Sequence, residues 1–288
     1  MDIERVIVPL DESALSQRAL AIAATVARSS GATLLLYSQV DKHQPTGSRS
    51  DHLQQLAATV DDVEVEVHVG EDPTPAKGIE QVVRARERSL LCMSTHGRGG
   101  VGKSLLGSVA EDVLARLTDP ILLIGQHCDP EASPVTGEVV VCVDGSTLSE
   151  AMIDWGAEWA ATFGQPLRLL QVIAEDWADE VAAAGVDLGD VSEASYVMEL
   201  ASRLRHRSSL SPESEVAYAD DPKHPADAIT ETLRARAAGL AALSTHGRSG
   251  LHRLIVGSVT MRVVHDAPCP ALVYRPSALD EEAVRRTA

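Results

Sequence analysis

Two loops rich in glycine and serine are the parts of the sequence best suited to binding an anion. The first reads Ser94-Thr-His-Gly97-Arg-Gly-Gly100, and the second reads Ser244-Thr-His-Gly247-Arg-Ser-Gly250. Each loop runs on to a Gly-Ser pair, Gly107-Ser108 or Gly257-Ser258, where a helix is expected to start. Small residues let a backbone approach phosphate oxygens, and the amides and dipole of a helix start favour negative charge. The loops therefore predict phosphate sites, with a purely structural strand-to-helix turn as the alternative.

The first loop also fits a second phosphate pattern. Residues Gly97–Ser104 satisfy Gly-x4-Gly-Lys-Ser, in which Lys103 would neutralise phosphate and Ser104 would hold magnesium. The second loop lacks the Lys-Ser element, because it continues through His252 and Arg253. A P-loop NTPase is thus the less favoured interpretation.

Both loops belong to an internal repeat. Asp11 in Arg5–Ser13 corresponds to Asp144 in Val139–Ser146, 144 − 11 = 133 residues later, whereas the loops lie 247 − 97 = 150 residues apart. The second copy therefore carries 150 − 133 = 17 extra residues, which we place within 174–214. We predict one domain at 1–127, a linker at 128–136, a second domain at 137–276 and a tail at 277–288.

Apolar runs alternate with helical patterns along each copy. In the first copy, strands are predicted over 5–10, 33–40, 90–94 and 121–124, and the alternating residues 63–69 predict an edge strand. Helices are expected to start after Ser13, Thr74 and Gly107. This alternation indicates a parallel sheet, in which ligands bind at the carboxyl ends of the strands near the switch point. The tip of the first strand and the loop after the fourth meet there.

At this point the sequence resembles the universal stress protein family in its tandem two-domain form. The family motif is Gly-x-x-Gly-x9-Gly-Ser/Thr, and both Gly97 to Gly107 and Gly247 to Gly257 match its second part. Ser94 and Ser244 replace its first glycine, which would strain the chain only if that position needs a positive φ. Because both copies share the change, we expect it to be harmless. The resemblance implies two α/β/α sandwiches, each with a five-stranded parallel sheet of order 3-2-1-4-5, an adenine-nucleotide α-hydrolase-like fold.

The resemblance also implies ATP as the ligand, with or without Mg²⁺. It puts Asp11 and Asp144 at the adenine and ribose edge, although a cap on the following helix is an alternative role for each. The backbone near Gln39 and Val172 would meet the base. The implied contacts of the first half are Pro9, Leu10, Asp11, Gln39, Ser94, His96, Gly97, Arg98, Gly107, Ser108 and Val109. Those of the second half are Val143, Asp144, Val172, Ser244, His246, Gly247, Arg248, Gly257, Ser258 and Val259.

Composition excludes several classes of function. The net charge is 25 − 42 = −17, which disfavours nucleic acids and anionic membranes as partners. No apolar window is long enough to span a bilayer and the start lacks a signal-peptide pattern, so we expect a cytoplasmic protein. The four cysteines form no Cys-x-x-Cys pair and are expected to be buried hydrophobic residues. His43, His52 and His127 show no ligand spacing, so no metal is assigned to protein side chains.

These observations favour an ATP-binding sensor or regulator in stress physiology. No nucleophile and base recur together in both loops, so no catalytic residue is assigned, and slow ATP hydrolysis stays open. A nucleotide-free interaction module is the alternative from another class. The halves are expected to pair as an intrachain pseudo-dimer through 121–124 and 271–274, which would cover two apolar sheet edges. Members of the family often assemble, so the resemblance also allows a homodimer. A regulatory role would require a protein partner, which the sequence does not identify.

Overall fold

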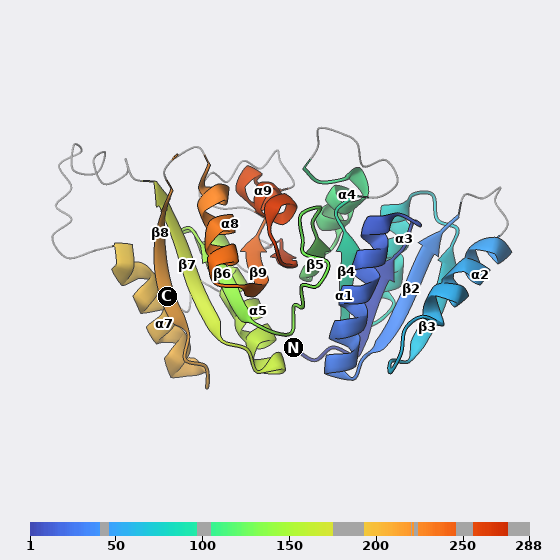
Figure 1. Cartoon of the computed structure of the whole chain (residues 1–288), viewed down its shortest axis with the longest axis horizontal. Coiled ribbons are helices and arrows are strands. Elements are labelled where there is room, and N and C mark those ends of the chain that lie inside the picture. The colour runs from blue at the N-terminus through green and yellow to red at the C-terminus, as the bar shows by residue number, and fades with distance from the viewer. Residues whose placement is uncertain are drawn as a thin grey trace.

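The structure is a computed structural model of the chain. It describes residues 1–40, 46–96, 105–174, 193–219, 221, 224–245 and 256–275. Figure 1 shows the two halves of the chain side by side, with the N-terminus between them. The amino group of Met1 donates to Thr162 Oγ1 at 2.8 Å, so the start of the first half contacts a helix of the second.

The strands of both halves join into one sheet. They are β1 (Arg5–Pro9), β2 (Thr33–Gln39), β3 (Val65–Gly70), β4 (Ser89–Ser94), β5 (Ile121–Ile124), β6 (Glu138–Val143), β7 (Leu167–Ala174), β8 (Glu213–Ala219), β9 (Ala238–Ser244) and β10 (Ala271–Tyr274). The sheet order is β3-β2-β1-β4-β5-β10-β9-β6-β7-β8. Each half therefore has the order 3-2-1-4-5, as predicted, with its strands parallel.

The halves meet where β5 pairs with β10 in the antiparallel sense, with Leu122 opposite Leu272. Every residue of both strands is buried. Because β5 and β10 pair with each other, neither strand is an exposed apolar edge with which another chain could pair and aggregate. We call this pair of strands, with the following residues 125–129 and Arg275, the seam.

Helices cover both faces of the sheet (Figure 1). They are α1 (Ala14–Ser30), α2 (Thr46–Ala57), α3 (Pro75–Arg84), α4 (Ser108–Arg116), α5 (Thr147–Phe163), α7 (Glu193–Arg207), α8 (Pro225–Ala235) and α9 (Ser258–Asp266). One apolar core collects side chains of α1, α2, α5 and α7, and a second collects those of α3, α4, α8 and α9. The layers are therefore helix, sheet and helix, as expected of a doubly wound fold.

Local sequence signals set most helix ends. Ser13 and Ser146 cap α1 and α5 by accepting the N–H three residues ahead, at 3.1 Å in each case. Gly31 and Gly164 end these helices with φ angles of 71° and 66°, a conformation that glycine adopts without strain. The sequence patterns do not predict helix α2. Leu53 is its only fully buried residue, so the helix lacks the repeated apolar positions that would indicate it.

The strand registers place most of the extra residues of the second copy. Leu35 pairs with Glu66, and their counterparts Arg168 and Glu213 also pair. The first offset is 168 − 35 = 133 and the second is 213 − 66 = 147, so 14 residues are added between β7 and β8. Helix α7 follows this addition. Among the described residues, no helix is both long enough and apolar enough to cross a membrane.

Candidate anion sites at the strand-to-helix loops

The turn after the first strand of each half is held by an aspartate. Asp11 Oδ1 accepts the N–H of Ser13 at 3.1 Å, and Asp144 Oδ1 accepts both the N–H and the hydroxyl of Ser146, at 3.0 and 2.6 Å. Such a carboxylate turn positions the serine that caps the next helix. Both aspartates thus support the start of a helix, the alternative role considered for them from sequence.

The residue after each aspartate has a left-handed backbone. Gly145 has φ = 83°, and its counterpart Glu12 has φ = 70°. Glutamate is strained there where glycine is not. Glu12 pairs with Arg49 of α2, whereas Tyr196 of α7 donates to Glu150 Oε1 at 2.9 Å beside the second turn. Burial, with the charges of Glu150 and Asp144, raises the pKa of Tyr196 well above its usual range.

The loop after the fourth strand is closed at its base in both halves. The N–H of Gly107 donates to the Thr95 carbonyl at 2.8 Å, and the N–H of Gly257 donates to that of Thr245 at 2.6 Å. These bonds fix the start of α4 and α9 directly beside the ends of β4 and β9. A Cβ on Gly107 would lie 2.6 Å from the Thr95 oxygen, so this close approach requires glycine.

Helices α4 and α9 start without a side-chain cap. Their N-cap residues are Gly107 and Gly257, with extended backbones, whereas α1, α3 and α5 begin at a serine or threonine that accepts a backbone N–H. The first amides of a helix have no partner within it. Helix α8, with His224 at its N-cap, also starts without a side-chain cap, but among the described helices only α4 and α9 start at a glycine beside the end of a central strand. The N-terminus of such a helix suits an anionic oxygen.

Ser94 and Ser244 end β4 and β9 in ordinary strand conformation. The described non-glycine residues with positive φ are Glu12, Asp62, Arg88 and Ala237, so neither serine is strained. Ser94 Oγ donates to the His96 carbonyl at 3.0 Å, which shapes the start of the loop. The replacement of the first motif glycine by serine is therefore compatible with this backbone.

His96 and Gln39 are engaged within the protein. His96 is buried, and its Nδ1 lies 3.1 Å from Thr95 Oγ1. Gln39, at the end of β2, donates to the Asp72 carbonyl and accepts a hydrogen bond from the Tyr37 hydroxyl at 3.0 Å. Its counterpart Val172 lies within β7, where it pairs with Ala217.

The structure brings part of each sequence-predicted set together. Because β4 lies beside β1, and β9 beside β6, the two loops of each half meet at the switch point of the sheet. Five of the predicted residues lie outside the described residues, namely Gly97, Arg98, His246, Gly247 and Arg248. The P-loop alternative at Gly97–Ser104 also lies there.

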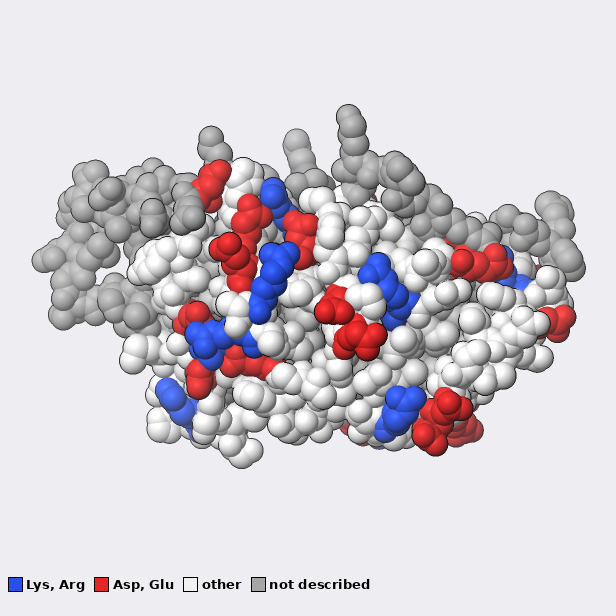
Figure 2. Space-filling view, viewed as in Figure 1, with Lys and Arg blue, Asp and Glu red and all other residues white. Residues whose placement is uncertain are grey.

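Charges of opposite sign are mixed over the surface. Figure 2 shows acidic side chains beside basic ones on the face that it displays. On α3 and α4, Glu80 pairs with Arg84 at 3.1 Å and with Arg116 at 3.2 Å. On α8 and α9, Arg262 pairs with Asp227 at 3.1 Å. Because the net charge of the protein repels anions, any anion site must depend on local groups such as the helix starts.

A cluster that sequence spacing did not indicate lies at the seam. His127, His265 and Asp266 each offer a donor atom within 4.8 Å of the others. His127 and His265 are 138 residues apart in the chain, and only the pairing of β5 with β10 brings them together. No local signal could have found them.

The fold and the two loops define a class of protein, a tandem doubly wound α/β protein with a helix-start site at each switch point. A family model described as "Universal stress protein family" matches residues 2–125 and again 136–275. The chain belongs to the universal stress protein family, in two copies.

Individual relatives agree with this assignment. Universal stress protein Rv2005c of Mycobacterium tuberculosis is 28% identical over 193 residues, which are 67% of this chain and 64% of that protein. The alignment thus spans somewhat less than two thirds of the relative. Universal stress protein MJ0531 of Methanocaldococcus jannaschii is 41% identical over 51 residues, or 18% of this chain and 30% of its own.

Two solved structures share the fold along nearly the whole chain. A universal stress protein from Archaeoglobus fulgidus has a TM-score of 0.68 at 16% identity, covering 96% of this chain and 100% of its own. The functionally unknown protein PA1789 from Pseudomonas aeruginosa has a TM-score of 0.63 at 18% identity, covering 99% and 98%. At these identities the likeness supports the fold alone.

Proposed function

We propose that each half of the chain binds an adenine nucleotide, ATP, and that the protein acts as a non-enzymatic sensor or regulator in the stress response. One observation carries the proposal, which is that α4 and α9 start at uncapped glycines beside the turn of the first strand. Helix starts of this kind favour phosphate oxygens. Mg²⁺ would accompany the triphosphate, because it reduces repulsion by a protein of net charge −17.

The proposed pose combines the positions of the two helix starts with the ribose and base contacts that the family resemblance implies. Phosphates would lie against the amides that follow Gly107 and Gly257, with the ribose near Asp11 and Asp144. The base would lie toward the ends of β2 and β7.

The first experiment measures what the purified protein already holds. The untreated chain is denatured and the released nucleotide is quantified by chromatography, per chain. Calorimetric titration with Mg²⁺ and ATP then follows for the wild type, Gly107→Val and Gly257→Val. A Cβ at these positions would lie 2.6 and 3.0 Å from a backbone oxygen, so each valine should displace one helix start. Gly47→Val is the control, because a Cβ there meets nothing within 4 Å.

Each outcome separates the hypotheses. Two ATP per chain, with one site lost in each variant and none in Gly47→Val, supports the proposal. No released nucleotide and no binding on titration would reject it in favour of a nucleotide-free interaction module. Loss of all binding in Lys103→Ala would instead favour the P-loop NTPase. Steady release of phosphate from ATP over many turnovers per chain would refute the non-enzymatic role.

A further inference from the structure

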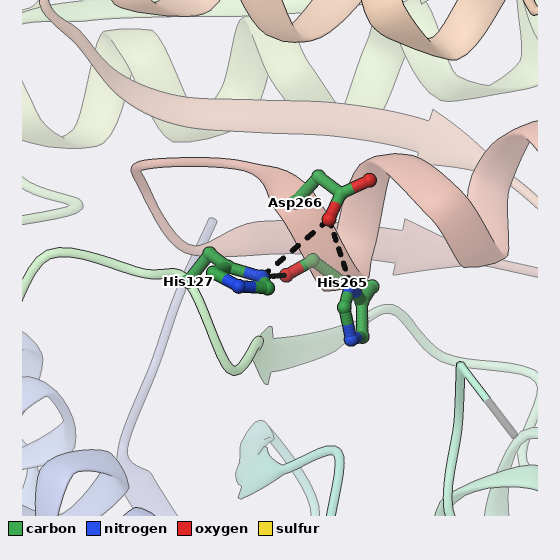
Figure 3. A group of neighbouring side chains, drawn as sticks. All are labelled: His127, His265 and Asp266. Carbon is green, nitrogen blue, oxygen red and sulfur yellow. Dashed lines mark hydrogen bonds and ion pairs between the residues drawn. The ribbon is translucent and has the colours of Figure 1, made fainter. Parts of the chain in front are cut away.

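We propose that His127, His265 and Asp266 form a binding site for a divalent transition-metal ion, Zn²⁺ above all, at the seam. Figure 3 shows the three side chains converging, with His127 on the segment after β5 and the other two at the end of α9. The site joins the two halves of the chain, and the ring centroid of His265 lies 6.5 Å from that of His96, an implied contact of the first nucleotide site.

The backbone around the cluster is closely fixed. The N–H of His127 donates to the His265 carbonyl at 3.3 Å, and the N–H of Asp129 donates to that of Pro268 at 2.8 Å. Gly125 packs so tightly that an added Cβ would lie 1.9 Å from the Val264 oxygen. Backbone contacts on both sides of His127 thus hold it against the end of α9, and a metal needs such fixed ligands.

The hydrogen bonds of His265 leave a position for a cation. Its Nε2 lies 3.2 Å from Gln126 Oε1, and the tautomer with the proton on Nε2 can donate to that oxygen. In the neutral ring, Nδ1 then directs a lone pair at Asp266 Oδ1, only 2.7 Å away. Two acceptors at that distance repel unless a proton or a metal ion lies between them.

The second histidine faces the same carboxylate. His127 Nδ1 lies 3.4 Å from Asp266 Oδ1 and 3.1 Å from the His265 carbonyl oxygen. Metal binding at Nδ1 requires the tautomer of His127 with its proton on Nε2, and it replaces the hydrogen bond that Nδ1 can donate to that carbonyl. Two ligands held tetrahedrally at about 2.0–2.1 Å from zinc are about 3.3–3.4 Å apart. The His127–Asp266 separation already fits, and the His265–Asp266 pair needs to open by about 0.6 Å. The ligand atoms of the two histidines lie within 4.8 Å of each other, so His127, the more exposed side chain, must turn toward His265 to complete the site.

The chemistry of the group selects the ion. Two imidazoles and one carboxylate suit Zn²⁺ and similar first-row ions better than Mg²⁺ or Ca²⁺, which prefer oxygen. Three protein ligands leave a fourth position for water. The bond from His265 Nε2 to Gln126 is the kind of outer contact that orients a metal-binding histidine.

Access and competing charges also fit. The side chain of His127 is 58% exposed and that of Asp266 31%, so an ion can enter from solvent. Arg262 Nε approaches the other oxygen, Asp266 Oδ2, at 3.7 Å, but it lies closer to Asp227 at 3.1 Å. Oδ1 therefore remains directed at the two histidines.

The test uses the full chain, freed of metal with a chelator and kept without nucleotide. Zn²⁺ is titrated by calorimetry in two buffers of different ionisation enthalpy, and Co²⁺ is titrated by visible absorption. The variants are His127→Ala, chosen because that side chain is exposed, and Asp266→Asn. His206→Ala is the matched control, since His206 is an exposed histidine on α7, away from the cluster.

The expected result is one Zn²⁺ per chain, with protons released on binding and Co²⁺ absorbing as a tetrahedral complex. His127→Ala and Asp266→Asn should weaken Zn²⁺ binding at least about tenfold, and His206→Ala should match the wild type. Zn²⁺ should also raise the melting temperature of the wild type but not of His127→Ala. Wild-type protein without a saturable site, or equal affinity in His127→Ala, would overturn the proposal. Because no nucleotide is present, failure here leaves the proposed ATP sites untouched.

Discussion

Replacing Tyr37 by phenylalanine should make the protein less sensitive to alkali. Tyr37 lies on β2 and is 1% exposed, and its hydroxyl donates to Gln39 Oε1 at 3.0 Å. Burial, followed by the nearby Asp72 carboxylate, raises the pKa of Tyr37 from 10.0 to about 12. The folded protein therefore holds the phenolic proton more tightly than the unfolded chain does.

The size of the effect follows from this shift. Two pKa units at about 1.4 kcal/mol each correspond to roughly 3 kcal/mol of stability. The folded-state pKa lies above the unfolded one, so ionisation of Tyr37 at high pH lowers the free energy of unfolding. The contribution is complete below pH 10 and is lost as the pH rises from 10 to 12. At neutral pH, Tyr37→Phe should cost about 1 kcal/mol through the hydrogen bond to Gln39.

Urea unfolding at several pH values between 8 and 12 measures the difference. The wild type should lose roughly 3 kcal/mol more than Tyr37→Phe across the upper half of this range. Buried cysteine thiols, whose pKa burial also raises, are present in both proteins and cancel in the comparison. Tyr218→Phe, at a side chain that is 59% exposed, is the control and should follow the wild type. Parallel pH profiles for wild type and Tyr37→Phe would refute the reasoning.

Three further changes test the seam and the core. Gly125→Ala should destabilise the protein by about 3 kcal/mol in urea unfolding, because the new Cβ would lie 1.9 Å from a backbone oxygen. Gly47→Ala, on open helix surface, should be neutral or stabilising by less than about 1 kcal/mol. Arg168→Met should cost about 3 kcal/mol, since that side chain is 6% exposed between Glu138 at 3.0 Å and Glu215 at 3.2 Å. Burial raises the pKa of the cysteine thiols, so iodoacetamide at pH 8 should label none in the folded protein and all four in urea.

Three results would contradict these predictions. Equal stability of Gly125→Ala and Gly47→Ala would mean that the seam backbone yields easily. Rapid labelling of Cys142, the one cysteine that is not fully buried, would mean that its side chain opens to solvent. An Arg168→Met protein as stable as the wild type would mean that the surrounding carboxylates are well solvated.

Sequence patterns predicted what depends on near neighbours in the chain. The helix starts expected after Ser13, Thr74 and Gly107 follow from short-range chemistry, and the structure confirms them. The sheet order of each half came from the family resemblance and is also confirmed. The edge position of β3 followed from its alternating residues and holds as well.

Other features depend on contacts between distant segments. Helix α2 has one buried residue, too few to form a recognisable apolar pattern. The positive φ of Glu12 could not be predicted, because glutamate is not a residue type that favours this conformation. The roles of His127 and His265 depend on a strand pairing that spacing along the chain cannot express. The phosphate-loop glycines 97 and 247 remain predictions, because they lie outside the described residues.

Joining both halves in one chain frees the seam from symmetry. By the 150-residue offset, His265 corresponds to Ala115, because 265 − 150 = 115. One side of the seam accordingly has His127 against the His265 carbonyl, whereas the other has Arg275 donating to the Ala115 carbonyl at 2.6 Å. Two identical subunits would have to repeat one contact twice, and they would separate on dilution. A fused pair keeps its partner at any protein concentration, so mutation can specialise each side of the seam independently.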